Sequence, residues 1–264
     1  MKGIIYYYSL TGNTRLACQY LARQAEAADF ELQDIRRAER LDPQAYDVCG
    51  FACSTDFMRP PRLMDAFIRE LPMQDRKPAF ILNTNAGMPG RTLPIMNEWL
   101  TRRGFLVFAG HALLAPESYP PLRAIGLSHD GQPNQADLAK FNGFVADLDR
   151  SLKHGLQGLQ PAHFEVGRLN DLYVRGFGPK APRVKSKRRL RPELCSECGL
   201  CARECPYQAI TLDPKPRFDM DKCGECWACY NRCPEQAVYV RPWRRSRYRR
   251  PSRDYQRKLG TTEE

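Results

Sequence analysis

Hydrophobic residues in the first 155 positions follow two patterns that alternate along the chain. Short apolar and aromatic runs, typical of buried strands, occur at 2–8, 30–35, 46–53, 78–83 and 105–110. Between these runs, apolar positions recur at helical spacing at 16–26, 62–71, 92–103 and 135–154. Five strands that alternate with helices predict an α/β fold, a doubly wound parallel sheet.

A turn rich in hydroxyl groups joins the first strand to the first helix. Its candidate phosphate-binding residues are Ser9, Thr11, Gly12, Asn13 and Thr14. Backbone N–H groups at a helix N-terminus bind anions, and nearby hydroxyls can donate to the same oxygens. No lysine follows the glycine and no GxGxxG is present, so the nucleotide-triphosphate and dinucleotide loops are excluded. The alternative is that these residues form only a helix cap and a turn.

Two further loops leave the third and fourth predicted strands, at 54–60 and 84–90. In open parallel sheets, ligands bind beyond the carboxyl ends of the strands, at the point where the strand order reverses. We therefore predict that side chains in these loops complete a ligand site with the turn at 9–14. The candidates are Ser54, Thr55, Asp56, Phe57, Asn85, Ala86 and Gly87.

Eight of the eleven cysteines form two copies of one spacing, C-x2-C-x2-C-x3-C-P, near the end of the chain. This spacing holds [4Fe–4S] clusters through thiolates, and its fourth cysteine ligates the other cluster. We therefore predict crossed ligation, in which each cluster takes three cysteines from one block and the last cysteine from the other. Cluster I takes Cys195, Cys198, Cys201 and Cys233, and cluster II takes Cys223, Cys226, Cys229 and Cys205. Zinc is the alternative, but it needs two pairs of ligands and has no use for a third evenly spaced cysteine.

The cysteine region is an internal repeat that is too short to fold on apolar burial alone. Clusters are expected to take the place of a core, as metals do in other small domains. Without them, we expect the chain to be disordered from about residue 190 onward.

These motifs together resemble flavodoxin–ferredoxin fusion proteins of the EFR type. The resemblance is carried by residues 6–14, 83–90, 117–121, both cysteine blocks and 247–251. It implies FMN held without a positive charge at its phosphate, the strand order 2-1-3-4-5 and a bacterial-type two-cluster ferredoxin domain. Many flavodoxins place the flavin ring between a tryptophan and a tyrosine. The two loops here contain neither, and Phe57 and Met88 are the nearest candidates.

The expected domain organisation has four parts. Residues 1–155 form the FMN-binding domain, 156–190 a linker, 191–240 the two-cluster ferredoxin domain and 241–264 a basic C-terminal tail. Cys18, Cys49 and Cys53 have no metal spacing and are expected to be buried. Unpaired thiols and oxidisable clusters favour a reducing compartment, and no membrane span or signal peptide is visible, so we expect a cytoplasmic protein.

Charge is spread unevenly over a chain whose net charge is +11. Residues 192–240 carry eight acidic and five basic side chains, whereas the flanking runs at 183–191 and 241–250 hold six Lys or Arg each. The basic runs could pack within the molecule, dock an acidic partner or bind nucleic acid.

These features together predict electron transfer between FMN and the two clusters. The protein would then serve as a carrier or as a reductase for a redox partner, expected to be acidic, or for a small quinone-like acceptor. The alternative is a redox-sensing or nucleic-acid-binding protein with structural clusters and a basic tail. No catalytic acid–base group is identified, because the four histidines are scattered.

Overall fold

Five parallel strands form the central sheet of the N-terminal domain, in the order β2-β1-β3-β4-β5. The computed structural model describes residues 1–38, 42–156, 158–167, 171–172, 174, 186–246, 248 and 250–260. The strands are β1 (Lys2–Tyr8), β2 (Asp29–Asp34), β3 (Val48–Ser54), β4 (Lys77–Asn85) and β5 (Phe105–Leu114). The predicted α/β class and strand order are confirmed. The last strand is longer than predicted, because its pairing with β4 continues from Phe105 to Leu114.

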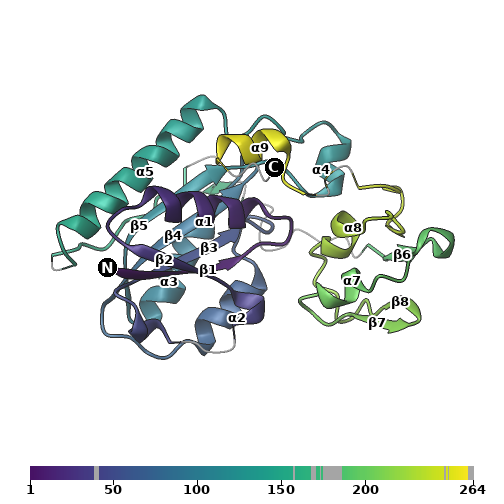
Figure 1. The fold of residues 1–264 in the computed structure, drawn as a ribbon, viewed down its shortest axis with the longest axis horizontal. Helices are drawn as coiled ribbons and strands as arrows, with labels where there is room; N and C mark the ends of the chain where they lie inside the picture. The colour runs from purple at the N-terminus through teal and green to yellow at the C-terminus, as the bar shows by residue number, and fades with distance from the viewer. Residues whose placement is uncertain are drawn as a thin grey trace.

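Helices cover both faces of this sheet (Figure 1). One face packs against α1 (Asn13–Gln24) and α5 (Gln135–Lys153), and the other against α2 (Arg62–Glu70) and α3 (Thr92–Arg102). Side chains along β1 alternate between the two layers, with Ile5 in the first and Tyr6 in the second. Shorter elements are η1 (Ile35–Arg37), η2 (Pro43–Ala45) and α4 (Pro120–Ala124).

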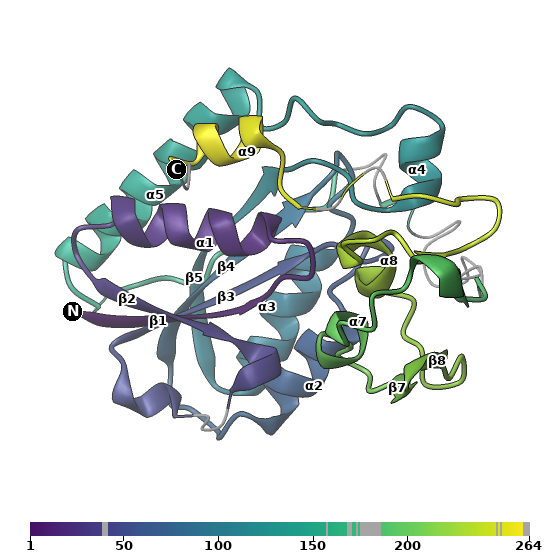
Figure 2. The same ribbon diagram turned by 45° about the vertical axis from the view of Figure 1, so that its right-hand side comes forward.

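The cysteine region is a small α+β unit beside the carboxyl ends of the strands (Figure 2). It contains η3 (Pro192–Leu194), α7 (Leu200–Arg203) and α8 (Ala228–Arg232). Two antiparallel pairs complete it: β6 (Arg189–Leu190) with β9 (Val238–Tyr239), and β7 (Ile210–Asp213) with β8 (Lys215–Phe218). Its buried apolar cluster comprises Trp227, Tyr230, Val238 and Val240.

The end of the chain returns to the N-terminal domain. Helix α9 (Arg253–Lys258) lies beside α1 (Figure 1), and Tyr255 and Leu259 are fully buried in the same layer as α1 and α5. The side chain of Arg23 donates to the carbonyl oxygen of Leu259 at 2.7 Å. Within the expected basic tail, the described residues from Tyr248 onward thus pack onto the first domain, whereas Trp243 packs against the apolar cluster of the cysteine region.

Much of the predicted linker at 156–190, and Arg247 and Arg249 of the second basic run, lie outside the described residues. Within the described part of the chain, no helix combines the length and the apolar character needed to cross a membrane.

Candidate functional site

The turn at 9–14 leads into α1 without a side-chain cap. Gly12 adopts φ +104°, the left-handed region, immediately before the helix, and no side chain hydrogen-bonds to the first turn. The N–H groups of that turn are therefore free of capping side chains, as an anion site at a helix N-terminus requires. A Cβ atom on Gly12 would lie 2.8 Å from the ring of Pro251. Both the backbone angle and the tail require glycine here.

The polar side chains of this turn have different partners. The Ser9 and Thr11 hydroxyls make no hydrogen bond to any described residue, so both can donate to a bound anion. Thr14 Oγ1 lies 2.8 Å from Thr84 Oγ1, and either hydroxyl can be the donor. Asn13 is engaged elsewhere, because its Nδ2 donates to the carbonyl oxygen of Pro116 at 3.0 Å.

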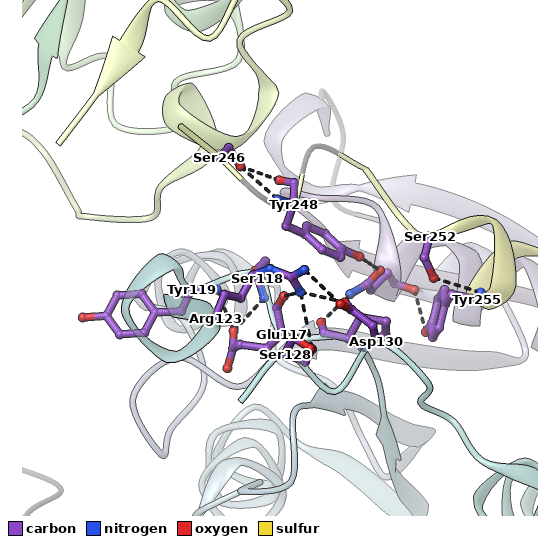
Figure 3. Close-up of polar contacts among 12 residues, drawn as sticks. Glu117, Ser118, Tyr119, Arg123, Ser128, Asp130, Ser246, Tyr248, Ser252 and Tyr255 are labelled. Carbon is purple, nitrogen blue, oxygen red and sulfur yellow. Dashed lines mark hydrogen bonds and ion pairs between the residues drawn. The ribbon is translucent and has the colours of Figure 1, made fainter. Parts of the chain in front are cut away.

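Two tyrosines from the C-terminal segment hold Asn13 (Figure 3). The Tyr248 hydroxyl donates to Asn13 Oδ1, and the Tyr255 hydroxyl donates to the Asn13 carbonyl oxygen at 3.2 Å. Ser246 in turn accepts from the Tyr248 backbone N–H at 3.1 Å. Tyr248 is 3% exposed, so this aromatic ring cannot stack on a nucleic-acid base as the nucleic-acid alternative requires.

The loops after β3 and β4 contact each other closely. Thr55 Oγ1 lies 2.9 Å from Thr92 Oγ1 and 3.2 Å from Asn83 Oδ1. Phe57 and Met58 both adopt positive φ, at 47° and 67°. A Cβ on Gly90 would meet the Met58 backbone at 2.3 Å, so the second loop can approach the first only through glycine.

The remaining loop candidates have structural partners of their own. Asn85 Oδ1 accepts from the Gly87 backbone N–H at 3.0 Å, which closes a tight turn around Ala86. Asp56 and Arg59 form an isolated backbone bridge that orients the first loop. The predicted residues of all three loops thus gather at the carboxyl ends of β1, β3 and β4, with Ser54 as the last residue of β3.

The cysteines fall into two spatial groups. One cavity is lined by Cys205 together with Cys223, Cys226 and Cys229. Burial raises the pKa of Cys201 to about 11, and Cys233, Cys195 and Cys198 are the charged neighbours that raise it further. Each group consists of three cysteines of one block and the last cysteine of the other. The structure thus brings together the cysteines that the spacing assigns to each crossed set, and their ligation of clusters stays a prediction.

The backbone around each block repeats the same shape. Glu197 and Glu225 both have φ of 56°, and Gly199 and Trp227 are left-handed at equivalent positions. In each repeat, the last cysteine accepts a backbone N–H at Sγ, from Ala209 to Cys205 at 3.3 Å and from Ala237 to Cys233 at 3.2 Å. Tight loops with N–H groups directed at sulfur fit thiolate ligands of a cubane cluster.

An aromatic contact, a hydrogen bond and an ion pair are among the contacts that join the described residues of the cysteine region to the first domain. Tyr119 follows β5, and its ring centroid lies 5.6 Å from that of Trp227. Asn231 Nδ2 donates to the carbonyl oxygen of Ser118 at 3.0 Å. Glu204 pairs with Arg36 of η1 at 3.1 Å.

Glu204 is the centre of this charged contact. Arg37 and Arg232 also reach its carboxylate, at 3.2 Å and 2.6 Å. Burial opposes ionisation of the carboxyl, but the three arginines outweigh it and hold the Glu204 pKa below its usual range.

An aromatic series spans the interface. The ring of Phe57 lies 5.5 Å from that of Tyr119, and Tyr119 contacts Trp227, which stands directly after Cys226. The loop after β3 is thereby linked through two aromatic contacts to a cysteine block.

Several of these residues are absent from the sequence-based prediction of the site. Tyr248, Pro251 and Tyr255 reach the turn at 9–14 from the opposite end of the chain, and Arg188 lies in a basic run. No periodicity or spacing connects them with the site. Cys18, Cys49 and Cys53 are fully buried, as expected, and burial raises the pKa of each thiol.

Comparisons with known proteins agree with this division. Residues 194–237 match the family model described as a 4Fe-4S dicluster domain. A flavodoxin of Maridesulfovibrio salexigens is 26% identical over 153 residues, which are 55% of this chain and 97% of that protein.

Solved flavodoxin structures align with a similar share of the chain. An archaeal flavodoxin covers 58% of this chain and 100% of its own, with 18% identity and a TM-score of 0.44. Flavodoxin 1 from Bacillus cereus covers 60% and 100%, with 18% identity and a TM-score of 0.45. The chain thus joins a flavodoxin-like domain to an iron–sulfur region, the combination of an electron-transfer protein.

Proposed function

We propose that this protein is an iron–sulfur flavoprotein that passes electrons between one FMN and two [4Fe–4S] clusters. The observation that carries the proposal is the Tyr119–Trp227 contact. It brings the carboxyl edge of the flavodoxin-like sheet against a cysteine block, so cofactors bound in the two regions would be neighbours. We also propose membership of the EFR-type subfamily, on the sequence motifs described above.

The FMN phosphate is assigned to the uncapped start of α1. The N–H groups of the first turn and the hydroxyls of Ser9, Thr11 and Thr14 would donate to its oxygens, while Asn13 holds the turn in place. The ring is assigned to the space by the loops at 54–57 and 85–87, with Phe57 against Tyr119. When bound, FMN supplies an exchange of two electrons with donors and of single electrons with clusters.

The clusters are assigned by the crossed ligand sets. Cluster I is held by Cys195, Cys198, Cys201 and Cys233, and cluster II by Cys223, Cys226, Cys229 and Cys205. The cavity that the second set lines supports this assignment, as does the Cys233 charge beside Cys201.

Cluster II would be the one nearer the first domain. Trp227 lies in its ligand loop and contacts Tyr119. Burial raises the pKa of the Tyr8 hydroxyl at the end of β1, and the Cys226 thiolate is the charged neighbour that raises it most. Both observations support electron exchange between FMN and cluster II, with cluster I beyond it.

The redox partner is proposed to be an acidic protein that docks at an arginine-lined cavity. This cavity of about 760 Å³ lies between α4, α8 and residues 242–246. Arg191, Arg244 and Arg245 line it, and Tyr230 and Trp243 supply aromatic surface. Arg123 lines it as well and is paired with Asp130 at 2.7 Å. A positive surface of this kind attracts and orients an acidic partner. A small quinone-like acceptor is the alternative occupant.

We assign the protein to the cytoplasm, because a reducing compartment preserves the buried thiols and the clusters.

Cofactor analysis of protein purified under anaerobic conditions tests the proposal. We expect one FMN with about eight iron and about eight sulfide per chain, as two cubane clusters require. Mixing the oxidised protein with a low-potential reductant should bleach flavin and cluster absorbance together. Zinc in place of iron, or protein without flavin that binds DNA in a salt-dependent way, would refute it.

A further inference from the structure

Arg188 is a buried cation whose hydrogen-bonding capacity is only partly used. The side chain is 4% exposed, and its Nη1 donates to the carbonyl oxygen and the hydroxyl of Ser186, at 2.6 Å and 2.8 Å. Its Nε and Nη2 are buried and make no hydrogen bond within the described part of the chain. Leaving buried charged donors without partners is costly, so a compensating group is expected.

No carboxylate in the described ranges compensates this charge. Arg188 forms no ion pair with a described residue, and its guanidinium lies over the ring of Trp227, 4.2 Å from the centroid. A cation–π contact of this kind stabilises the side chain's position but offers no acceptor in the plane of the guanidinium. The two unpartnered donors remain available.

The same side chain lines the cavity of the cluster II cysteines. Arg188 shares that cavity with Cys205, Cys223, Cys226 and Cys229. A cubane core with four thiolates is anionic, and its sulfurs accept hydrogen bonds, so it supplies what Arg188 lacks.

The repeat places no cation at the position that is equivalent to Arg188. The internal repeat that relates Cys195 to Cys223 relates Arg188 to Pro216, which has no charge and no donor. Arg203, in the first cysteine block, is exposed and donates to the carbonyl oxygen of Cys198 at 2.8 Å. The repeat is thus symmetric in its cysteines, and a buried cation lines only the cavity of the second set among the described residues.

We propose that Arg188 is the counter-ion and hydrogen-bond donor of cluster II and raises its reduction potential relative to cluster I. Positive charge and hydrogen bonds to cluster sulfur stabilise the reduced, more negative state. An electron that reaches the clusters would then reside on cluster II, the one beside Tyr119 and the flavin loops. This inference rests on the proposed cofactor content and adds a difference between the two clusters to it.

A redox titration monitored by electron paramagnetic resonance tests this role on the intact, anaerobically purified protein. Arg188→Met removes the charge and the hydrogen-bond donors and replaces them with an unbranched apolar side chain. Arg188→Lys keeps the charge but loses the planar donors. Arg217→Met is the matched control, since Arg217 is exposed on β8 and pairs with Asp213 at 2.9 Å. Iron, sulfide and FMN are measured on every sample.

We expect Arg188→Met to lower the reduction equilibrium constant of one cluster at least tenfold, a shift of about 59 mV for one electron. The other cluster should keep its potential, Arg188→Lys should lie between Arg188→Met and the wild type, and Arg217→Met should match the wild type. Unchanged potentials, or equal shifts of both clusters, would overturn the inference.

The measured cluster content distinguishes a failure of this inference from a failure of the proposed function. Wild-type protein without iron would refute the function itself, whereas loaded protein with unshifted potentials would refute only the role of Arg188. If Arg188→Met fails to assemble one cluster and Arg188→Lys assembles it, the need for the charge is supported. If neither variant assembles that cluster, Arg188 has a structural role, and the proposed effect on the reduction potential is refuted.

Discussion

The two halves of this molecule are stabilised in different ways. Among the described residues, the flavodoxin-like sheet is covered on its two faces by clusters of twenty and sixteen buried hydrophobic residues. The cysteine region has a cluster of four. At about 25 cal/mol per Å² of buried apolar area, the first domain can fold on burial, whereas the second needs ligation of its clusters.

The two halves also present their candidate cofactor-binding residues in different ways. The first domain keeps its polar loops at one edge of its sheet, and the second holds its cysteines in loops that contain left-handed residues. Glu197, Glu225 and Trp227 adopt φ values that cost about 1–2 kcal/mol each for residues with a Cβ. Cofactor binding can therefore rigidify one half of the molecule and leave the other half unchanged.

Removal of iron should give the largest effect and should separate the halves. A chelator under reducing conditions should unfold residues from about 190 to 240, because few apolar side chains remain to hold them. Hydrogen exchange measured by mass spectrometry should show β7 and β8 unprotected, with β1 and β3 protected as before. Protected β7 and β8 in the apo-protein would show that the second region folds without its clusters.

Single cysteine substitutions should test the crossed ligand sets. Cys205→Ala and Cys226→Ala should each remove the same cluster, because both residues line one cavity, whereas Cys233→Ala should remove the other. Iron content should fall by about half in all three variants. If the resonance signal lost with Cys205→Ala matched that lost with Cys233→Ala, each block would hold its own cluster.

Changes in the phosphate turn should release flavin and leave the clusters in place. Gly12→Leu should abolish FMN retention, because the side chain is strained at φ +104° and collides with Pro251. Thr11→Val removes one charge-assisted donor and should weaken binding by about 1.5–3 kcal/mol.

Fluorescence titration of apo-protein with FMN measures both effects. Gly143→Ala is the matched glycine control, since no atom lies within 4 Å of a Cβ built there. Retention of FMN in the Gly12 variant would mean that the phosphate binds elsewhere.

Acidification should loosen the contact between the halves. The pKa of Glu204 is lowered in the docked state, so its contribution is present above the ordinary carboxyl value and is lost as pH falls through the lowered value. Small-angle scattering should show expansion over that range in the wild type. Glu204→Gln should be expanded already at neutral pH and should change little on acidification. Identical pH profiles for the two proteins would show that Glu204 does not stabilise the interface.

The smallest effect should come from the tail. Tyr248→Phe removes one hydrogen bond to Asn13 and should weaken FMN binding by about 0.5–1.5 kcal/mol, with the clusters unaffected. Tyr239→Phe is the control, because Tyr239 lies on β9 in the cysteine region. An unchanged FMN affinity in Tyr248→Phe would limit the tail to a packing role.

Local patterns in the sequence predicted both folds. The alternation of apolar runs and helical periodicity indicated the doubly wound sheet, because each strand and helix must bury one face of its own. The cysteine spacing indicated two ligand sets, because a cubane is held by residues close together in the chain. The turn at 9–14 could be singled out for the same reason, since Gly12 and its neighbours lie within one turn of the start of α1.

Only the tertiary structure revealed how these parts cooperate. Tyr248 and Asn13 lie near opposite ends of the chain, and Tyr119 meets Trp227 across two domains. Arg188 belongs to a basic run whose other members give no sign that one of them is buried beside four cysteines. Contacts of this kind leave no periodicity or spacing in the sequence. They depend on how two domains, each with a fold specified by its own residues, pack together.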